Sequence, residues 1–214
     1  MYILKALSDT PIGRALIAYF FDLPRWTLVN ILFAASLTPA FLALLNGAVG
    51  WIGLLTFPVV MVSAGMINMA AREVIEEIPR WRDALTHPAT YLTAFTIWVG
   101  LIVVLTVLLA DPPMIVFFII CAIALALLMV SVCALFTPAL LKAKGVLVWR
   151  NALVLAVHYP MVALGLVALL AVGGWVVWIS RGTLLLLVPA LWTMIAVFSV
   201  QDRISALQPT SQSN

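Results

Sequence analysis

Long apolar segments alternate with short polar segments along this chain. Six of the apolar segments are about 20 residues long, which is the length a helix needs to cross a hydrocarbon core of roughly 30 Å. The pattern therefore predicts an all-α, polytopic membrane protein with about six transmembrane helices. The predicted spans are residues 28–46, 51–71, 89–110, 114–141, 160–179 and 183–200.

The chain before the first span predicts a short helix that lies in the headgroup region. Thr10 and Pro11 indicate a helix start, because a hydroxyl caps the first turn and proline is favoured at the first helical position. Arg14 and Asp22 interrupt the apolar positions that follow, and Pro24 is expected to end this helix. The expected organisation is an interfacial segment, a six-helix transmembrane domain and a polar tail, at residues 1–25, 26–200 and 201–214.

The basic residues predict the orientation of the spans. Counted before, between and after the six spans, Lys and Arg number three, none, three, none, three, one and one. Cytoplasmic loops of membrane proteins are enriched in these residues, so both termini are expected in the cytoplasm. In a five-span alternative, the second segment is re-entrant, the C-terminus lies outside and the charge pattern is broken.

Composition supports a membrane protein and excludes other classes. Only 9% of the residues are charged and the mean hydropathy is +1.22, whereas soluble domains carry roughly 25% charged residues. The net charge of +3 reflects the inward-facing basic residues, so nucleic acid is not an expected partner. Cys121 and Cys133 would lie about 18 Å apart on one helix, too far apart for a disulfide.

The sequence shows no set of residues suited to catalysis or to metal binding. No ionisable residue lies in the middle of a predicted span, and such residues usually mark proton relays and ion-coupled transport. His87 and His158 lie at the ends of different spans without a partner at helical spacing, so neither a metal nor a cofactor is expected. Residues 71–74 lack the Glu-Ala-Ala…Gly loop of ABC permeases. We therefore expect a non-enzymatic protein.

Two cytoplasmic segments share a short sequence. Residues 81–85 read Trp-Arg-Asp-Ala-Leu and residues 149–153 read Trp-Arg-Asn-Ala-Leu, each after a predicted span that descends to the cytoplasm. This echo indicates a parallel internal repeat, or an independent preference of interfacial elbows for Trp and Arg. The nearby carboxylates belong either to a docking surface or to a solvated helix face with i,i+4 ion pairs. The candidate partner-contact residues are Trp81, Arg82, Trp149, Arg150, Glu73 and Glu76.

Three prolines fall in the outer half of spans one, two and six: Pro39, Pro58 and Pro189. Each removes a backbone hydrogen bond, so together they predict an outward-opening cavity, or only kinks that fit the helices to one another. Small polar residues occur on the first two spans, where hydrogen bonds between these two helices are expected. These residues are Asn30, Ser36, Thr38, Thr56, Ser63 and Asn68.

Four motifs follow one another along residues 26–200. They run from Asn30 to Pro39, from Pro58 to Glu73, through Trp81-Arg82-Asp83, and through residues 138–140, 151–153 and 158–160. This order resembles the YesL-like family of uncharacterised bacterial integral membrane proteins. One departure is the wide separation of Pro39 and Pro58, with Phe57 where the family has Gly. The resemblance implies the bacterial inner membrane and an accessory role in carbohydrate import, with no catalytic residues to transfer.

These observations leave several functions open. The leading hypothesis is an accessory or scaffold subunit that contacts other membrane transport subunits through the two elbows. The alternative is a small-molecule binding or permeation subunit, similar in length and span number to the substrate-capture component of an energy-coupling-factor importer. A third option is a structural subunit of another membrane assembly. The lipid bilayer is an expected partner in every case.

Overall fold

The computed structural model describes residues 10–47, 51–74, 79–110, 112–180 and 182–207, and the secondary structure of this part is entirely helical. Four of its helices are long and apolar enough to cross a membrane. The all-α membrane fold is thus confirmed, whereas the count of six spans is not. The four helices are α3 (Leu23–Leu45), α6 (Pro88–Leu109), α7 (Met114–Leu141) and α9 (Pro160–Ile179).

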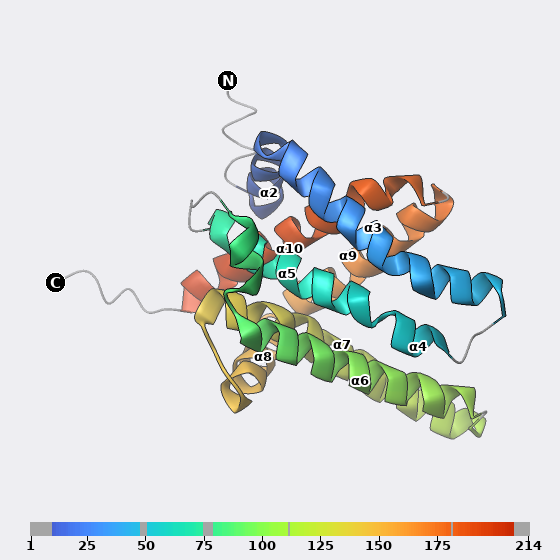
Figure 1. The fold of residues 1–214 in the computed structure, drawn as a ribbon. Helices are drawn as coiled ribbons and strands as arrows, with labels where there is room; N and C mark the ends of the chain where they lie inside the picture. Colours follow the sequence, from blue (N-terminus) through green and yellow to red (C-terminus); the bar gives the residue numbers. More distant parts are fainter. Residues whose placement is uncertain (1–9, 48–50, 75–78, 111, 181, 208–214) are drawn as a thin grey trace.

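Two further long helices, α5 (Phe57–Val74) and α10 (Val188–Leu207), form the centre of the bundle (Figure 1). Residues 64–71 of α5 are all buried, and α10 contacts α3, α5, α7 and α9. In α7, by contrast, only 6% of the most apolar stretch is buried within the protein. A helix surrounded by protein does not need the uniformly apolar surface of a lipid-facing helix. This position accounts for the lower apolar character of α5 and α10.

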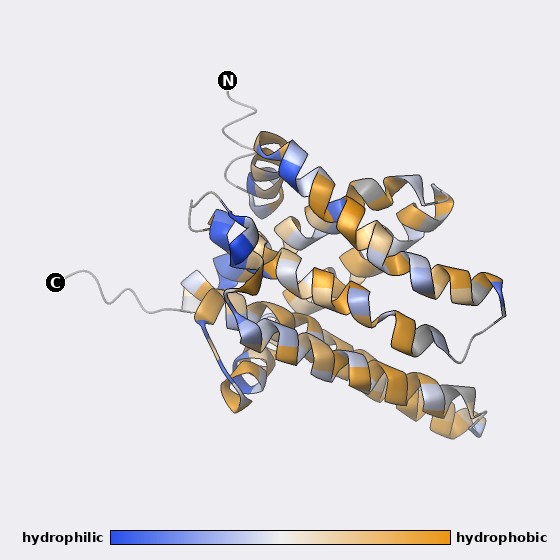
Figure 2. Ribbon diagram, viewed as in Figure 1, coloured by the Kyte–Doolittle hydropathy of each residue, from blue (hydrophilic) through white to orange (hydrophobic). Residues whose placement is uncertain are grey.

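Both ends of the described chain lie at the same end of the bundle (Figure 1). The short helices η2 (Trp81–Leu85) and α8 (Val146–His158) lie there too. The turn after α3 leads to α4 (Ile52–Leu55) at the opposite end. Hydrophilic residues gather at the end with the termini (Figure 2), which we assign to the cytoplasm from the count of Lys and Arg.

Several predicted boundaries are correct and others are not. Helices α7 and α9 begin and end at the predicted residues. The second segment is broken at Thr56, between α4 and α5. The sixth is broken at Leu187, between η3 (Thr183–Leu186) and α10. Helix α10 continues to Leu207, beyond the predicted end of the sixth span at Val200.

The N-terminal helix α2 (Pro11–Phe21) starts as predicted, since the Thr10 hydroxyl oxygen accepts the Gly13 N–H at 3.0 Å. Pro24 does not end this helix. It lies in the first turn of α3, where a missing N–H breaks no helical hydrogen bond.

Helix α2 packs against α10. Arg14 on α2 forms an ion pair with Asp202 on α10. The Arg14 guanidinium also lies 5.5 Å from the centre of the Phe198 ring, within range of a cation–π contact. These contacts stabilise the part of α10 that extends beyond the predicted end of its span.

The fully buried Asn30 side chain joins α2, α3 and α10. Its Oδ1 accepts the backbone N–H of Ala190 at 2.9 Å, and its Nδ2 donates to the Tyr19 hydroxyl at 3.4 Å. Ala190 is the third residue of α10, where an N–H has no partner within its own helix. The residue before α10 is Leu187, whose side chain has no acceptor. A side chain of α3 therefore supplies the cap that the local sequence lacks.

Asn68 makes the equivalent connection between α5, η2 and α6. Its Nδ2 donates to the Ala84 carbonyl at 2.7 Å, and its Oδ1 accepts the Thr90 hydroxyl at 2.7 Å. The Tyr91 hydroxyl donates to the same Ala84 carbonyl at 2.9 Å. The turn from α5 into α6 is thus tied to α5 by buried side chains.

The hydrogen bonds described for the polar residues of the first two spans run to other elements or within one helix. Asn30 and Asn68 bond to other elements, and Thr56 accepts the indole N–H of Trp98 on α6 at 3.1 Å. The remaining hydroxyls donate to carbonyls of their own helices; they belong to Ser36, Thr38 and Ser63. Sequence proximity of the spans did not reveal these partners.

Replacement of Asn30 by Leu is expected to lower the free energy of unfolding by roughly 1–3 kcal/mol, because the buried Ala190 N–H loses its acceptor. The measurement is thermal unfolding of the purified variant in detergent. Asn46→Leu is the matched control, since exposed Asn46 donates only to Leu42 of its own helix. Equal effects of both substitutions would contradict the capping role.

Candidate functional site

The first elbow, η2, exposes Trp81 and Arg82 at the end of the bundle that holds both termini. Trp81 is 49% exposed and Arg82 is also exposed. Beneath them Asp83 is buried, and its Oδ2 accepts the Arg80 N–H at 2.7 Å. The Arg72 Nε lies 4.0 Å from the Asp83 Oδ1. Both exposed side chains therefore lie on a turn that is stabilised by the contacts of buried Asp83.

A close approach between α5 and α6 positions this elbow. A Cβ atom at Gly65 would lie 3.1 Å from the Tyr91 hydroxyl oxygen and 3.5 Å from the Ala84 Cβ. The first distance is shorter than most contacts of real Cβ atoms. Glycine at this position lets the Tyr91 hydroxyl reach the elbow and bond to Ala84.

The second elbow contains Trp149 and Arg150 on α8. Arg150 is exposed, but Trp149 is half-buried and packs against the core. This elbow is an α-helix of 13 residues, whereas η2 is a 3₁₀ turn of five residues. The two segments that echo each other in sequence therefore differ in local structure, although both face the same end of the molecule (Figure 1).

Glu73 lies at the C-terminal end of α5, near Asp22 and Arg25 at the junction of α2 and α3. Partial burial and, secondarily, the negative charge of Asp22 raise the pKa of its carboxyl to about 7, against the opposing effect of Arg25. An interaction with the indole N–H of buried Trp26 also lowers the pKa of Glu73, although the two groups do not reach the geometry of a hydrogen bond. The carboxyl of Glu73 thus interacts with other residues of the protein and is not a simple surface charge. Glu76 lies outside the described residues.

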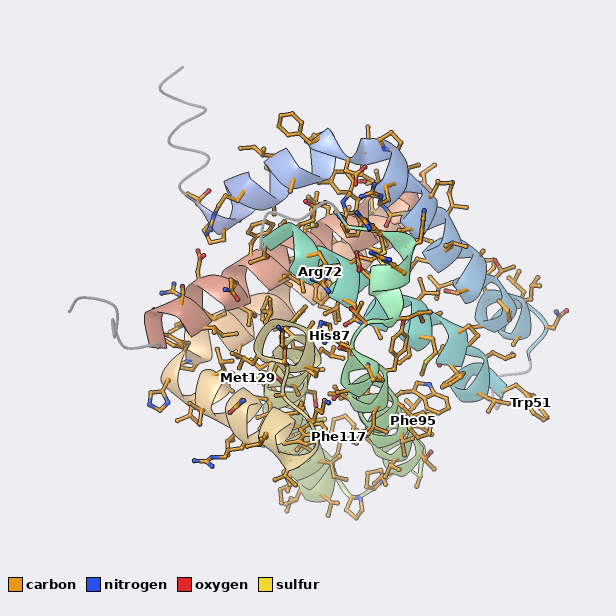
Figure 3. All side chains as sticks on the ribbon, turned by 60° about the vertical axis from the view of Figure 1, so that its left-hand side comes forward. Trp51, Arg72, His87, Phe95, Phe117 and Met129 are labelled. Atoms are coloured by element: carbon orange, nitrogen blue, oxygen red, sulfur yellow. The ribbon has the colours of Figure 1, made fainter. Side chains whose placement is uncertain are left out.

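His87 immediately precedes α6 and lies near Arg72 in the last turn of α5 (Figure 3). Burial, Arg72 and Lys142 together lower the pKa of its imidazole. His158 lies elsewhere, with its Nδ1 3.1 Å from the Val154 carbonyl. Within the described residues, no three His, Cys, Asp or Glu side chains form a group that could hold a metal ion.

An apolar cavity of about 290 Å³ lies between α3, α5, α7, α9, η3 and α10. Its lining includes Met66, Leu170 and Trp192, and glycine at Gly173 leaves space on the α9 side. The two lining hydroxyls, Ser63 and Thr193, donate to carbonyls of their own helices. The cavity therefore suits an apolar molecule.

The structure places the three prolines differently from one another. Pro189 lines the cavity, whereas Pro39 and Pro58 are exposed and do not contribute to its lining. Pro58 and Pro189 each occupy the second position of a helix, just after a point where the preceding helix is interrupted. At this position the missing N–H frees no carbonyl, so the expected loss of a helical hydrogen bond applies only to Pro39, inside α3.

No protein-family model matches this chain, and the comparisons with curated proteins and with solved structures also give no match. The resemblance to the YesL-like family stays a prediction. The geometry of the elbows and of the cavities is therefore the basis on which a function can be proposed.

Sequence reasoning missed the contacts that join distant segments. Asp22 and Arg25 precede Glu73 by about 50 residues, and Arg14 lies 188 residues from Asp202. No spacing rule relates such pairs, because they meet only when α2 packs on the bundle. Their single sequence signal is the presence of opposite charges near the ends of apolar segments.

Glu73→Gln is expected to change how stability depends on pH. The pKa of Glu73 is about 7 in the folded protein, against an ordinary value of 4.5, so the folded state binds this proton more tightly. The free energy of unfolding therefore falls as the pH rises from 4.5 to about 7. Thermal unfolding should show the variant to be more stable than wild type at pH 8 and similar at pH 5. A stability gap that is the same at both pH values would contradict the assignment.

Proposed function

We propose that this protein is a non-enzymatic membrane subunit that binds a partner of a transport system through its cytoplasmic elbows. The observation that carries the proposal is the exposure of Trp81 beside Arg82 on a turn held by Asp83 and Asn68. Trp and Arg are enriched among the residues that dominate binding energy at protein interfaces.

The rigidity of this turn supports a binding role further. A partner that binds a pre-ordered surface does not have to supply the free energy for ordering it. Arg150 on α8 adds a second exposed cation at the same end of the molecule. The resemblance to the YesL-like family suggests carbohydrate import in the bacterial inner membrane as the setting. Under this proposal the protein contributes contact and placement rather than chemistry.

A photo-crosslinking amino acid in place of Trp81 is expected to capture a transport subunit in native membranes. The same amino acid in place of Leu92, an exposed residue of α6, should not capture it. Adding Arg82→Glu or Arg150→Glu should reduce the crosslinked product by roughly 1.4- to 5-fold, since an exposed ion pair contributes about 0.2–1 kcal/mol. Labelling of introduced cysteines checks that the orientation in the membrane is intact. Capture that ignores both charge reversals would contradict the elbow as the contact.

The apolar cavity favours a second function, the binding of a small apolar molecule. It is lined by residues of six elements of the bundle and lies beside the break that precedes α10. Breaks in membrane helices often accompany binding sites in transporters. Here Asn30 accepts the Ala190 N–H at the break, and the lining of the cavity is mainly apolar.

Gly173→Leu should abolish ligand-induced stabilisation, because its side chain would enter the cavity, where Val188 lies 3.4 Å from the Cβ position. The measurement is the melting temperature of the purified protein with a panel of apolar ligands, since a ligand of the folded state raises it. Gly100→Leu on α6 is the control, with no atom within 4 Å of its Cβ position and no part in the cavity. If no ligand raises the melting temperature of wild type, this second function is wrong.

A further inference from the structure

A separate crevice of about 280 Å³ lies between α2, α9 and α10, at the end of the bundle that we assign to the cytoplasm. Helix α10 contacts both other helices and forms one wall of this crevice. None of the residues that line the crevice lines the apolar cavity described above. The crevice is therefore a distinct feature of the molecule.

The floor of the crevice is apolar and follows α9. Val162, Gly165 and Leu169 all line it, at a spacing that places them on one face of the helix. From Val162 to Leu169 the helix rises about 10 Å, so the floor leads from the polar end of the bundle toward its middle. A Cβ atom at Gly165 would have no atom within 4 Å, which shows that the space above the floor is open.

The rim of the crevice carries charge. Asp202 and Arg203 of α10 both line it, and Asp202 is engaged by Arg14 of α2. Arg203 is exposed, and its guanidinium lies 5.5 Å from the centre of the Tyr159 ring. Among the described residues Arg203 forms no ion pair with an acid. Arg14, which does not itself line the crevice, neutralises Asp202, so the positive charge of Arg203 is left uncompensated at the rim.

We propose that this crevice binds one anionic phospholipid of the cytoplasmic leaflet, with the phosphate at Arg203 and an acyl chain along α9. The apolar floor excludes a free phosphate as a sufficient occupant, because it would leave that floor uncovered. The charged rim favours an anionic headgroup over a zwitterionic one. Basic pockets between membrane helices are known to recognise such headgroups. This inference is independent of the proposed partner contact at the elbows.

Native mass spectrometry of the full chain in detergent tests the proposal, with phosphatidylglycerol or phosphatidylcholine of the same acyl chains as the titrated probe. We expect one phosphatidylglycerol to be retained more tightly than phosphatidylcholine. Arg203→Gln should weaken phosphatidylglycerol binding about fivefold, since one basic residue near a membrane surface contributes about 1 kcal/mol. Arg203→Lys should keep the binding, because it keeps the charge.

Gly165→Leu should weaken the binding of both lipids, because the new side chain would occupy the path of the acyl chain. Lys144→Gln and Gly100→Leu are the matched controls, since neither residue lines the crevice and Lys144 is an exposed cation. Inorganic phosphate in excess should not displace the lipid. Equal binding of both lipids by wild type, binding unchanged in Arg203→Gln and Gly165→Leu, or displacement by phosphate alone would each overturn the proposal. Melting temperatures of the variants verify that a lost signal does not reflect unfolding.

Discussion

The bond from the Ala190 N–H to the Asn30 side chain is the interaction on which the arrangement of the bundle depends. A helix that starts inside an apolar interior exposes N–H groups that neither water nor lipid can satisfy. The sequence before α10 offers only leucines for that purpose, so the acceptor has to come from another helix. Asn30 meets this need and at the same time contacts Tyr19 of α2. One buried amide therefore relates three helices to one another.

The same principle operates at the other side of the bundle centre. Asn68 lies on α5, and its amide is satisfied by the Ala84 carbonyl and the Thr90 hydroxyl. Fully satisfied buried polar groups specify one arrangement, because any alternative would leave them unpaired. The surfaces to which we assign binding lie next to these two networks. The first elbow depends on Asn68, and the crevice at Arg203 depends on the placement of α10 by Asn30.

Sequence patterns predicted the lipid-facing elements well and the central ones poorly. Helices α7 and α9 match their predicted bounds because lipid requires an uninterrupted apolar surface on the helices that it surrounds. The breaks at Thr56 and Leu187 were not predicted, since the groups that stabilise them lie on other helices. Of the candidate site residues, Trp81, Arg82 and Arg150 lie exposed at the end with the termini. Only Pro189 of the three prolines lines the apolar cavity. Neither the apolar cavity nor the crevice at Arg203 has a sequence signal of its own, because each is formed by helices far apart in the chain.

Hydrophobic periodicity and length by themselves determined that this chain is helical and embedded in a membrane, since no other arrangement solvates so few charges and so many apolar side chains. The count of Lys and Arg determined the orientation that we assign. Only the tertiary structure decided that α5 and α10 are central, that Arg14 pairs with Asp202, and that Glu73 lies among Asp22, Arg25 and Trp26. The physical reason is that a buried polar group can be satisfied by any suitable partner that packing brings near. The sequence shows which groups need partners but not where in space those partners are.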